Sequence, residues 1–127
     1  MRPEALFAGL KSKELMKEAE LLSFALTCLK QSGLVYWRVP NGPVMHSIGN
    51  KVIRKCSPIK GFPDIAGVFP NGKFFAIELK TDKGRLSPEQ HEWITKLNMS
   101  GAMAIVLRTK DEIREFIVAA SQIKAPT

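Results

Sequence analysis

Residues 64–80, DIAGVFPNGKFFAIELK, place the strongest constraint on the fold, because two apolar runs flank a Pro-Asn-Gly turn signal. This pattern predicts a β-hairpin with strands at 64–69 and 73–80. Asp64 begins the first strand, while Glu78 interrupts the second and Lys80 follows it. Because an unpaired buried charge destabilises a fold by several kcal/mol, charged groups in these core-forming segments require a physical reason.

The length of the turn determines which residues lie opposite one another. If residues 70–72 form a three-residue loop, Phe69 faces Lys73, and the same register brings Asp64 opposite Glu78. Their Cβ atoms would then lie about 4.5–5.5 Å apart on one face of the hairpin. Two carboxylates so placed repel each other unless a cation lies between them, and hard oxygen ligands favour Mg²⁺ or Mn²⁺.

Lys80 lies two residues beyond Glu78 and therefore points to the same side of its strand. A different register is the alternative. In that case Asp64 only begins the strand after Pro63, and Glu78 and Lys80 form an ordinary exposed face.

The rest of the chain alternates between helical and strand patterns, with cap and turn residues at the boundaries. We expect a loose arm or a short extra helix over residues 1–12, and the segment 44–56 is predicted as either a short hairpin or an irregular basic loop. The other predicted elements are a helix at 12–32, a strand at 34–39, a helix at 87–100, a strand at 102–107 and a helix at 111–123. This order predicts one α/β domain over residues 1–127, with a central mixed β-sheet flanked by helices.

Glu20 is the only charged residue between Ala19 and Leu29, on a helix that is apolar nearly all round. A helix of this kind is typically buried, so the Glu20 carboxylate should have a cation or strong hydrogen-bond donors as partners. Two alternatives are that the helix dipole stabilises Glu20 near the N-terminus or that its side chain reaches the surface past Met16.

Gln90 can be interpreted in two ways. Residues 87–90, SPEQ, fit a capping box in which Gln90 reaches back to the amide of Ser87. Gln90 also shares a helical face with Trp93 and Leu97, which would point it toward the sheet and the carboxylates. The two roles are compatible.

The charge distribution indicates a polyanionic partner. Of the formal net charge of +7, the whole excess lies between Lys30 and Arg85, which contain ten basic and three acidic residues. Such a basic region around paired carboxylates favours nucleic acid. Two cysteines without zinc-site spacing, and the absence of an apolar run of about 20 residues, lead us to expect a reduced, intracellular protein that does not span a membrane.

Several segments together resemble the VRR-NUC branch of the PD-(D/E)xK nuclease superfamily. They are KGFPDIAGVF, GKFFAIELKT, GRLSPEQHEWI and SGAMAIVL, with the letters PD at 63–64 and ELK at 78–80. Glu20 stands where the family has a helical glutamate, and the likeness extends to about Leu107. The resemblance implies a restriction-endonuclease-like sandwich with an αβββαβ core and metal-dependent hydrolysis of phosphodiester bonds.

Our hypothesis for the site follows from this resemblance. Asp64 and Glu78 would ligate Mg²⁺ or Mn²⁺, with the backbone carbonyl of Leu79 as a third protein ligand. Lys80 would orient or deprotonate the attacking water, and Gln90 would position Lys80 or the water. Glu20 would hold a second metal or a water.

Stand-alone members of this length resemble Holliday-junction resolvases, many of them from phages and bacteria. We therefore expect a cytoplasmic homodimer that cuts branched DNA. The alternatives are a flap, end-processing or nicking nuclease, and a non-catalytic nucleic-acid-binding module on the same fold. The residues expected to contact phosphates are Lys51, Arg54, Lys55, Lys60, Lys83 and Arg85.

Overall fold

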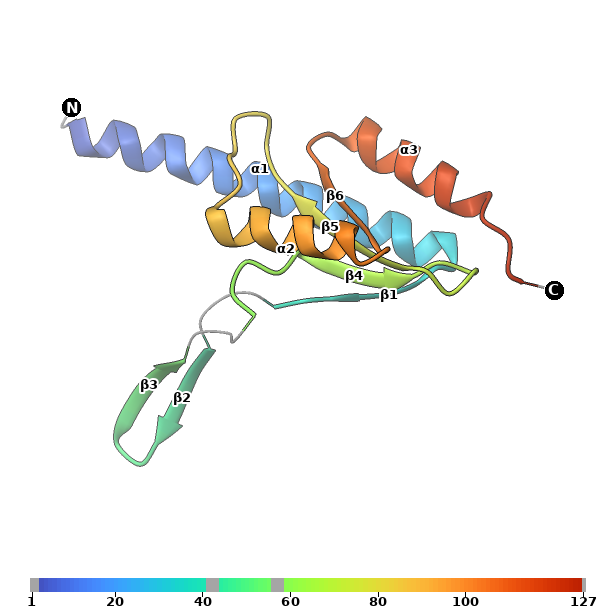
Figure 1. The fold of residues 1–127 in the computed structure, drawn as a ribbon. Helices are drawn as coiled ribbons and strands as arrows, with labels where there is room; N and C mark the ends of the chain where they lie inside the picture. The colour runs from blue at the N-terminus through green and yellow to red at the C-terminus, as the bar shows by residue number, and fades with distance from the viewer. Residues whose placement is uncertain (1–2, 41–43, 56–58, 127) are drawn as a thin grey trace.

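The computed structural model describes residues 3–40, 44–55 and 59–126 of the 127-residue chain (Figure 1). In chain order its elements are α1 (Pro3–Ser32), β1 (Val35–Arg38), β2 (Val44–Ile48), β3 (Lys51–Lys55), β4 (Ile65–Val68), β5 (Phe74–Leu79), α2 (Pro88–Met99), β6 (Met103–Leu107) and α3 (Lys110–Ser121).

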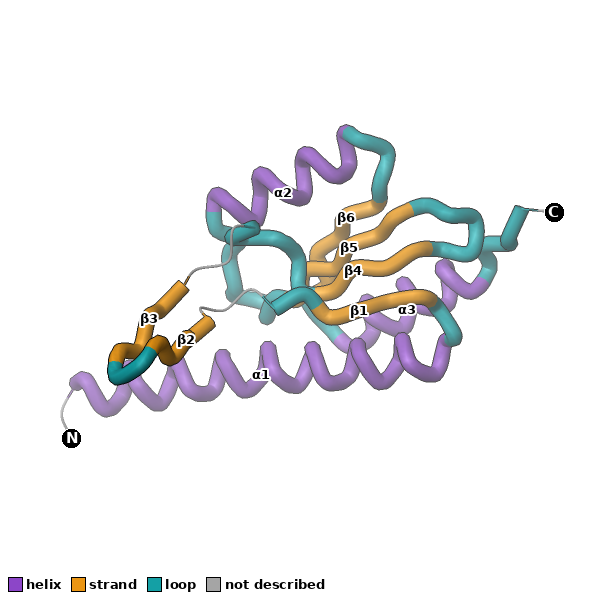
Figure 2. Tube along the Cα trace, turned by 90° about the horizontal axis from the view of Figure 1, so that it is seen from below, coloured by secondary structure: helices purple, strands orange, loops and turns teal. Residues whose placement is uncertain are grey.

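Four strands form a central mixed sheet in the order β1-β4-β5-β6. The pairs β1–β4 and β4–β5 are antiparallel, whereas β5 and β6 are parallel because the chain returns through α2 between them. Figure 2 shows α2 on one side of this sheet and α1 with α3 on the other. The fold is therefore the predicted α/β sandwich, consistent with a restriction-endonuclease-like architecture.

One detail of the prediction is wrong, and one of two predicted alternatives is confirmed. Residues 3–12 are neither a loose arm nor a separate helix, since they continue directly into α1. The β2–β3 hairpin, one of the two alternatives for its segment, is not part of the central sheet. Its strands form a second, two-stranded sheet that projects from the body of the protein (Figure 1).

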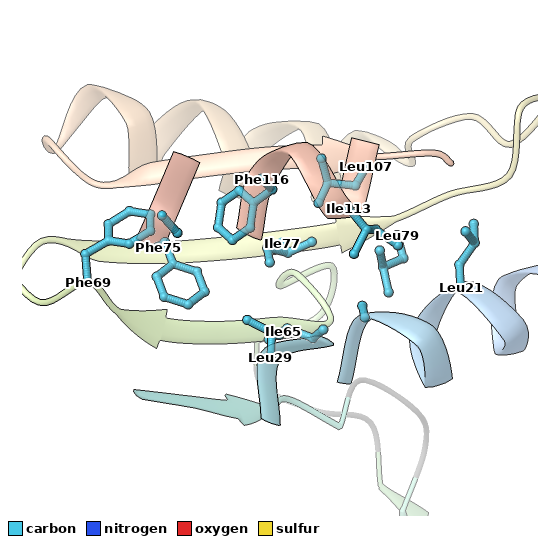
Figure 3. Close-up of a cluster of buried hydrophobic side chains, with 12 residues drawn as sticks. Leu21, Leu29, Ile65, Phe69, Phe75, Ile77, Leu79, Leu107, Ile113 and Phe116 are labelled. Carbon is cyan, nitrogen blue, oxygen red and sulfur yellow. The ribbon is translucent and has the colours of Figure 1, made fainter. Parts of the chain in front are cut away.

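The hydrophobic core lies between the sheet and the α1/α3 layer (Figure 3). On α1, Leu21, Ala25 and Leu29 are buried at intervals of four residues, which places them on one helical face. On β5, alternate side chains such as Phe75 and Ile77 point into the same core, together with Phe116 and Ile113 of α3. Each such side chain stabilises the fold by about 1.5–3 kcal/mol on burial. Glu78 alternates with these residues and belongs to the opposite face of β5.

Candidate active site

The hairpin register is the predicted one. The amide of Phe69 donates to the carbonyl of Lys73 at 2.9 Å across the three-residue loop, and Ile65 pairs with Ile77. The next position outward brings Asp64 alongside Glu78. The alternative, a different register in which Glu78 and Lys80 form an ordinary exposed face, is therefore wrong.

Asp64 and Glu78 line one cavity of about 280 Å³ at the end of the sheet. The other lining residues come from three different elements or their flanks, which shows that tertiary packing brings the site together. They are Glu18, Ala19 and Leu22 of α1, Leu79 and Lys80 at the end of β5, and Gln90 of α2.

Glu78 is the most deeply buried charged group of the site, with 2% of its surface exposed. Its Oε1 accepts a hydrogen bond from Nε2 of Gln90 at 2.9 Å, whereas its buried Oε2 has no hydrogen-bond partner among the described residues. Burial, reinforced by the charge of Asp64, raises the pKa of Glu78 to about 8 despite the opposing charge of Lys80. One carboxylate oxygen in the cavity is thus available to a ligand.

Asp64 is held at the entrance to β4. Its Oδ2 accepts a hydrogen bond from the amide of Leu79 at 2.9 Å. Burial raises the pKa of Asp64, while the Leu79 amide and the charges of Lys80 and Arg38 act in the opposite direction. Arg38 was not among the predicted site residues, because its proximity depends on the pairing of β1 with β4.

Lys80 lines the same cavity as the two carboxylates, and its charge acts on both, as expected from its spacing to Glu78. Its amide donates to the carbonyl of Leu107 at 3.2 Å, which fixes the end of β5 against β6. Its side chain is only 16% exposed, and Nζ lies 4.0 Å from Oε1 of Glu18.

Gln90 has both predicted roles at once. The backbone amide of Gln90 donates to Oγ of Ser87 at 3.1 Å. The side-chain Oε1 of Gln90 accepts from the backbone amide of Ser87 at 2.9 Å, which completes the capping box of α2. Its Nε2 remains free to reach Glu78. Helix capping therefore orients the amide that holds the Glu78 carboxylate.

The segment that leads into Asp64 is packed against the start of α2. Gly61 has a φ of +84°, and a Cβ atom there would lie 2.6 Å from Cβ of Glu89 and 2.8 Å from the amide nitrogen of Gln90. Nε1 of Trp93 also donates to the carbonyl of Lys60 at 3.2 Å. These contacts tie the position of Asp64 to that of Gln90.

Glu20 is exposed rather than buried, so the expectation that it needs a partner in the protein interior is wrong. It does not line the cavity as described, and Glu18 lies there instead. The reason is the position of each residue around the helix. Glu18 lies four residues before Leu22 and therefore on the same face, whereas Glu20 is rotated by about 200° from Glu18. The core-facing positions of α1 extend toward Glu18, but the nearly uniform apolar character of residues 19–29 conceals this helical phase in the sequence.

None of the described side chains expected to contact phosphates lines the cavity. Lys51, Arg54, Lys60, Lys83 and Arg85 are exposed, and the side chain of Lys55 lies outside the described part of the chain. Lys60 lies 3.7 Å from Glu89 in an exposed ion pair.

The loop that carries Lys83 is anchored by a residue that sequence reasoning missed. Nη1 of Arg108 donates to the carbonyls of Thr81 and Gly84 at 2.8 and 2.6 Å. Because this contact joins residues more than twenty positions apart, local sequence patterns gave no signal for it.

The donor set of the cavity fits a hard divalent cation. Two carboxylates converge, and one buried oxygen of Glu78 lacks a hydrogen-bond partner in the described residues. Within that same part of the chain, no group of three or more His, Cys, Asp or Glu side chains is arranged to hold a metal. Mg²⁺ is nevertheless commonly bound by one or two carboxylates together with waters and substrate phosphates, so the pair is sufficient.

Comparison with known proteins agrees with the geometry. The model of the VRR-NUC domain family matches residues 16–111, which include every residue that lines the cavity. No curated protein and no solved structure gave a significant match. Over the described residues, no helix has the length and apolar character required to cross a membrane. Because the matched segment is well over half of the chain, the protein belongs to the VRR-NUC domain family, a family of PD-(D/E)xK-type nucleases.

Proposed function

We propose that this protein is a Mg²⁺-dependent DNA endonuclease that hydrolyses phosphodiester bonds in branched DNA, with four-way (Holliday) junctions as its substrate and a homodimer as its working form. The observation that carries the proposal is the convergence of Asp64, Glu78 and Lys80 on one cavity, in which Oε2 of Glu78 is buried without a hydrogen-bond partner among the described residues. The cytoplasm is the expected site of action.

Asp64 and Glu78 would hold Mg²⁺ or Mn²⁺, with the carbonyl of Leu79 as a further ligand. When bound, the cation supplies Lewis-acid polarisation of the scissile phosphate. The hydrogen bonds from the Leu79 amide to Asp64 and from Gln90 to Glu78 orient the two carboxylates before the cation and substrate bind.

Lys80 contributes positive charge where negative charge develops on the phosphoryl oxygens, and its ammonium hydrogens orient the attacking water. The low exposure of its side chain strengthens these interactions. Glu18 restrains the ammonium from the opposite wall of the cavity. In this scheme Gln90 positions Glu78, which revises the expected role of positioning Lys80 or the water.

Exposed basic residues around the cavity would bind the phosphates of the DNA strands. Lys83 and Arg85 lie three and five residues after Lys80, and Arg38 lies close enough to influence Asp64. A two-fold homodimer would present two such cavities to paired strands of a symmetric junction. Glu20 has no role in this proposal, since it is exposed outside the cavity.

Cleavage mapping on a four-way junction, a flap, a nicked duplex and a linear duplex tests the proposal. Symmetrical paired incisions on the junction, present with Mg²⁺ and absent with EDTA, are the expected result. Preferential cutting of the flap would indicate a flap or end-processing nuclease, and cutting of one strand of the linear duplex would indicate a nicking nuclease. DNA binding without cleavage of any substrate, equal in the wild type and Asp64→Ala, would indicate a non-catalytic binding module.

A further inference from the structure

The β2–β3 hairpin exposes apolar side chains that the core does not use. Exposed fractions are 60% for Met45, 60% for Ile48, 63% for Val52 and 39% for Ile53. The hairpin projects away from the body, and its strands pair only with each other within the described residues (Figure 1). An isolated two-stranded hairpin is marginally stable in water, and clustered exposed apolar groups typically mark an interaction surface.

The apolar residues of the hairpin are not confined to one face. Ile48 pairs with Lys51, and Met45 pairs with Arg54. Because successive pairs point to opposite sides of a two-stranded ribbon, each face combines apolar and basic side chains. A hairpin that covers a protein core would instead be apolar on one face only.

The charge of this region identifies the chemistry of the partner. No Asp or Glu occurs between Glu20 and Asp64, whereas that interval contains six Lys and Arg residues. They are Lys30, Arg38, Lys51, Arg54, Lys55 and Lys60. Such a basic segment without acidic residues is complementary to the phosphates of DNA, and the exposed apolar side chains of the hairpin are suited to contacts with bases.

The hairpin is attached to the sheet next to the candidate active site. The amide of Val39, just after β1, donates to the carbonyl of Asp64 at 2.8 Å. The chain therefore leaves the sheet toward the hairpin, and returns from it, beside a proposed metal ligand. A DNA strand whose scissile phosphate reached Asp64 would pass close to the base of the hairpin.

We propose that the β2–β3 hairpin is an arm that recognises the branch point of the DNA. Its basic side chains bind phosphates, and its tip presents one exposed apolar side chain on each face, Ile48 and Val52, beside the Gly49-Asn50 turn. These two side chains pack against bases left unstacked at the branch. A two-stranded ribbon fits the major groove, and apolar side chains are used by DNA-binding proteins at opened base steps. A continuous duplex has no open step, so the tip contributes selectivity for structure. This inference rests on the proposed nuclease function.

The test compares the DNA affinities of two double variants by fluorescence anisotropy in the presence of Mg²⁺. Both variants also carry Asp64→Asn, which prevents cleavage during the measurement. Ile48→Ser/Val52→Ser should weaken binding to a four-way junction by about tenfold and change binding to a linear duplex by less than about twofold, given stacking contributions per base of this order. Lys51→Gln/Arg54→Gln should weaken both complexes alike and reduce the salt slope by about 2. Val118→Ser, which removes a similarly exposed valine from α3, is the matched control and should change neither.

Three outcomes would overturn the inference. Ile48→Ser/Val52→Ser could leave junction binding unchanged, or it could weaken junction and duplex binding equally. It could also convert a dimer into a monomer in sedimentation experiments, which would assign the tip to self-association. Thermal melting of each variant verifies that the fold is intact. Failure of the proposed function is a separate result, since it appears as the absence of Mg²⁺-dependent cleavage by the unmodified chain.

Discussion

The two hairpins of this protein differ in which of their side chains are explained by folding. In β4–β5, apolar residues such as Ile77 are buried by the fold, whereas the carboxylates of Asp64 and Glu78 have no role in packing. In β2–β3, basic residues are in contact with water as expected, whereas apolar residues such as Val52 are exposed without a structural reason. In each hairpin, the residues that folding does not explain are the best candidates for function.

The two hairpins also differ in whether their functional side chains are held in place before a ligand binds. The β4–β5 carboxylates are held by hydrogen bonds from Leu79 and Gln90, so their arrangement exists before any ligand binds. The exposed apolar side chains of β2–β3 would be buried only in a complex with DNA. Four predictions test the comparison.

The largest effect should come from the buried charges. Asp64→Ala removes a proposed metal ligand and should reduce junction cleavage by about 10³-fold or more, since charge stabilisation by the metal contributes several kcal/mol. Junction affinity should change by less than about twofold. Asp82→Ala, in the exposed loop just after Lys80, is the matched control and should retain full activity. Comparable single-turnover rates for the wild type and Asp64→Ala would contradict the enzymatic role.

Two isoleucines in equivalent strands test the difference in packing. Ile77 is 1% exposed and Ile53 is 39% exposed. Ile77→Ala should lower the free energy of unfolding by about 2–5 kcal/mol, because it leaves a cavity in the core. Ile53→Ala should change it by less than about 0.5 kcal/mol. Urea denaturation measures both, and equal losses would show that the β2–β3 hairpin contributes to the folded core.

The pH dependence of stability tests the burial of Glu78. Its pKa is raised from the ordinary value of 4.5 to about 8, so the folded state retains a proton that the unfolded state has lost. In metal-free buffer, the contribution of Glu78 to the free energy of unfolding should therefore be greatest below about pH 4.5. It should decline as the pH rises toward 8, by at most about 1.4 kcal/mol per pH unit. The pKa of Asp64 is raised as well and acts in the same direction.

Denaturation in EDTA at pH 5, 6.5 and 8 measures this decline. Glu78→Gln should remove most of it, because the amide does not titrate. Excess Mg²⁺ should restore stability at pH 8 in the wild type but not in Glu78→Gln. A wild-type profile that is flat in this range, or that rises with pH, would show that the Glu78 carboxylate is not buried as described.

The smallest effect concerns the helical glutamate. Glu18→Gln should lower the cleavage rate by about fivefold to tenfold, since a restraint on the Lys80 ammonium is lost while the ammonium itself remains. Glu20→Gln should have an effect of less than about twofold, because that side chain is exposed. A larger effect of Glu20→Gln than of Glu18→Gln would support the expected role of Glu20 in holding a second metal or a water.

The register of β4–β5 was predictable because it depends on local information. Once the loop length is known, pairing across the turn determines that Asp64 lies beside Glu78, and the capping box likewise depends only on the four residues 87–90. Both features were therefore available from the sequence, including the double role of Gln90.

The prediction for Glu20 shows that the orientation of α1 about its own axis could not be obtained from local sequence. The residues between Ala19 and Leu29 do not by themselves identify which side of α1 faces the sheet. The structure shows that Leu21, Ala25 and Leu29 are buried, and this phase brings Glu18 toward the cavity while Glu20 remains exposed. Anchoring the helical phase on the most buried positions would have corrected the prediction.

The separation of the β2–β3 hairpin from the central sheet lies beyond what local patterns can predict. Alternation and turn residues indicate strands, yet they carry no information about which sheet the strands join. The contacts of Arg108 with the loop after β5 are similarly non-local. These features depend on tertiary packing and required coordinates.

The central claim is that Asp64 and Glu78 together bind one divalent cation. Crystals soaked in Mn²⁺ and measured near the manganese absorption edge test it most directly. We expect an anomalous peak between the two carboxylates that is lost in Glu78→Gln crystals. A map with no peak in this cavity at saturating Mn²⁺, or with a peak that persists unchanged without the Glu78 carboxylate, would contradict it.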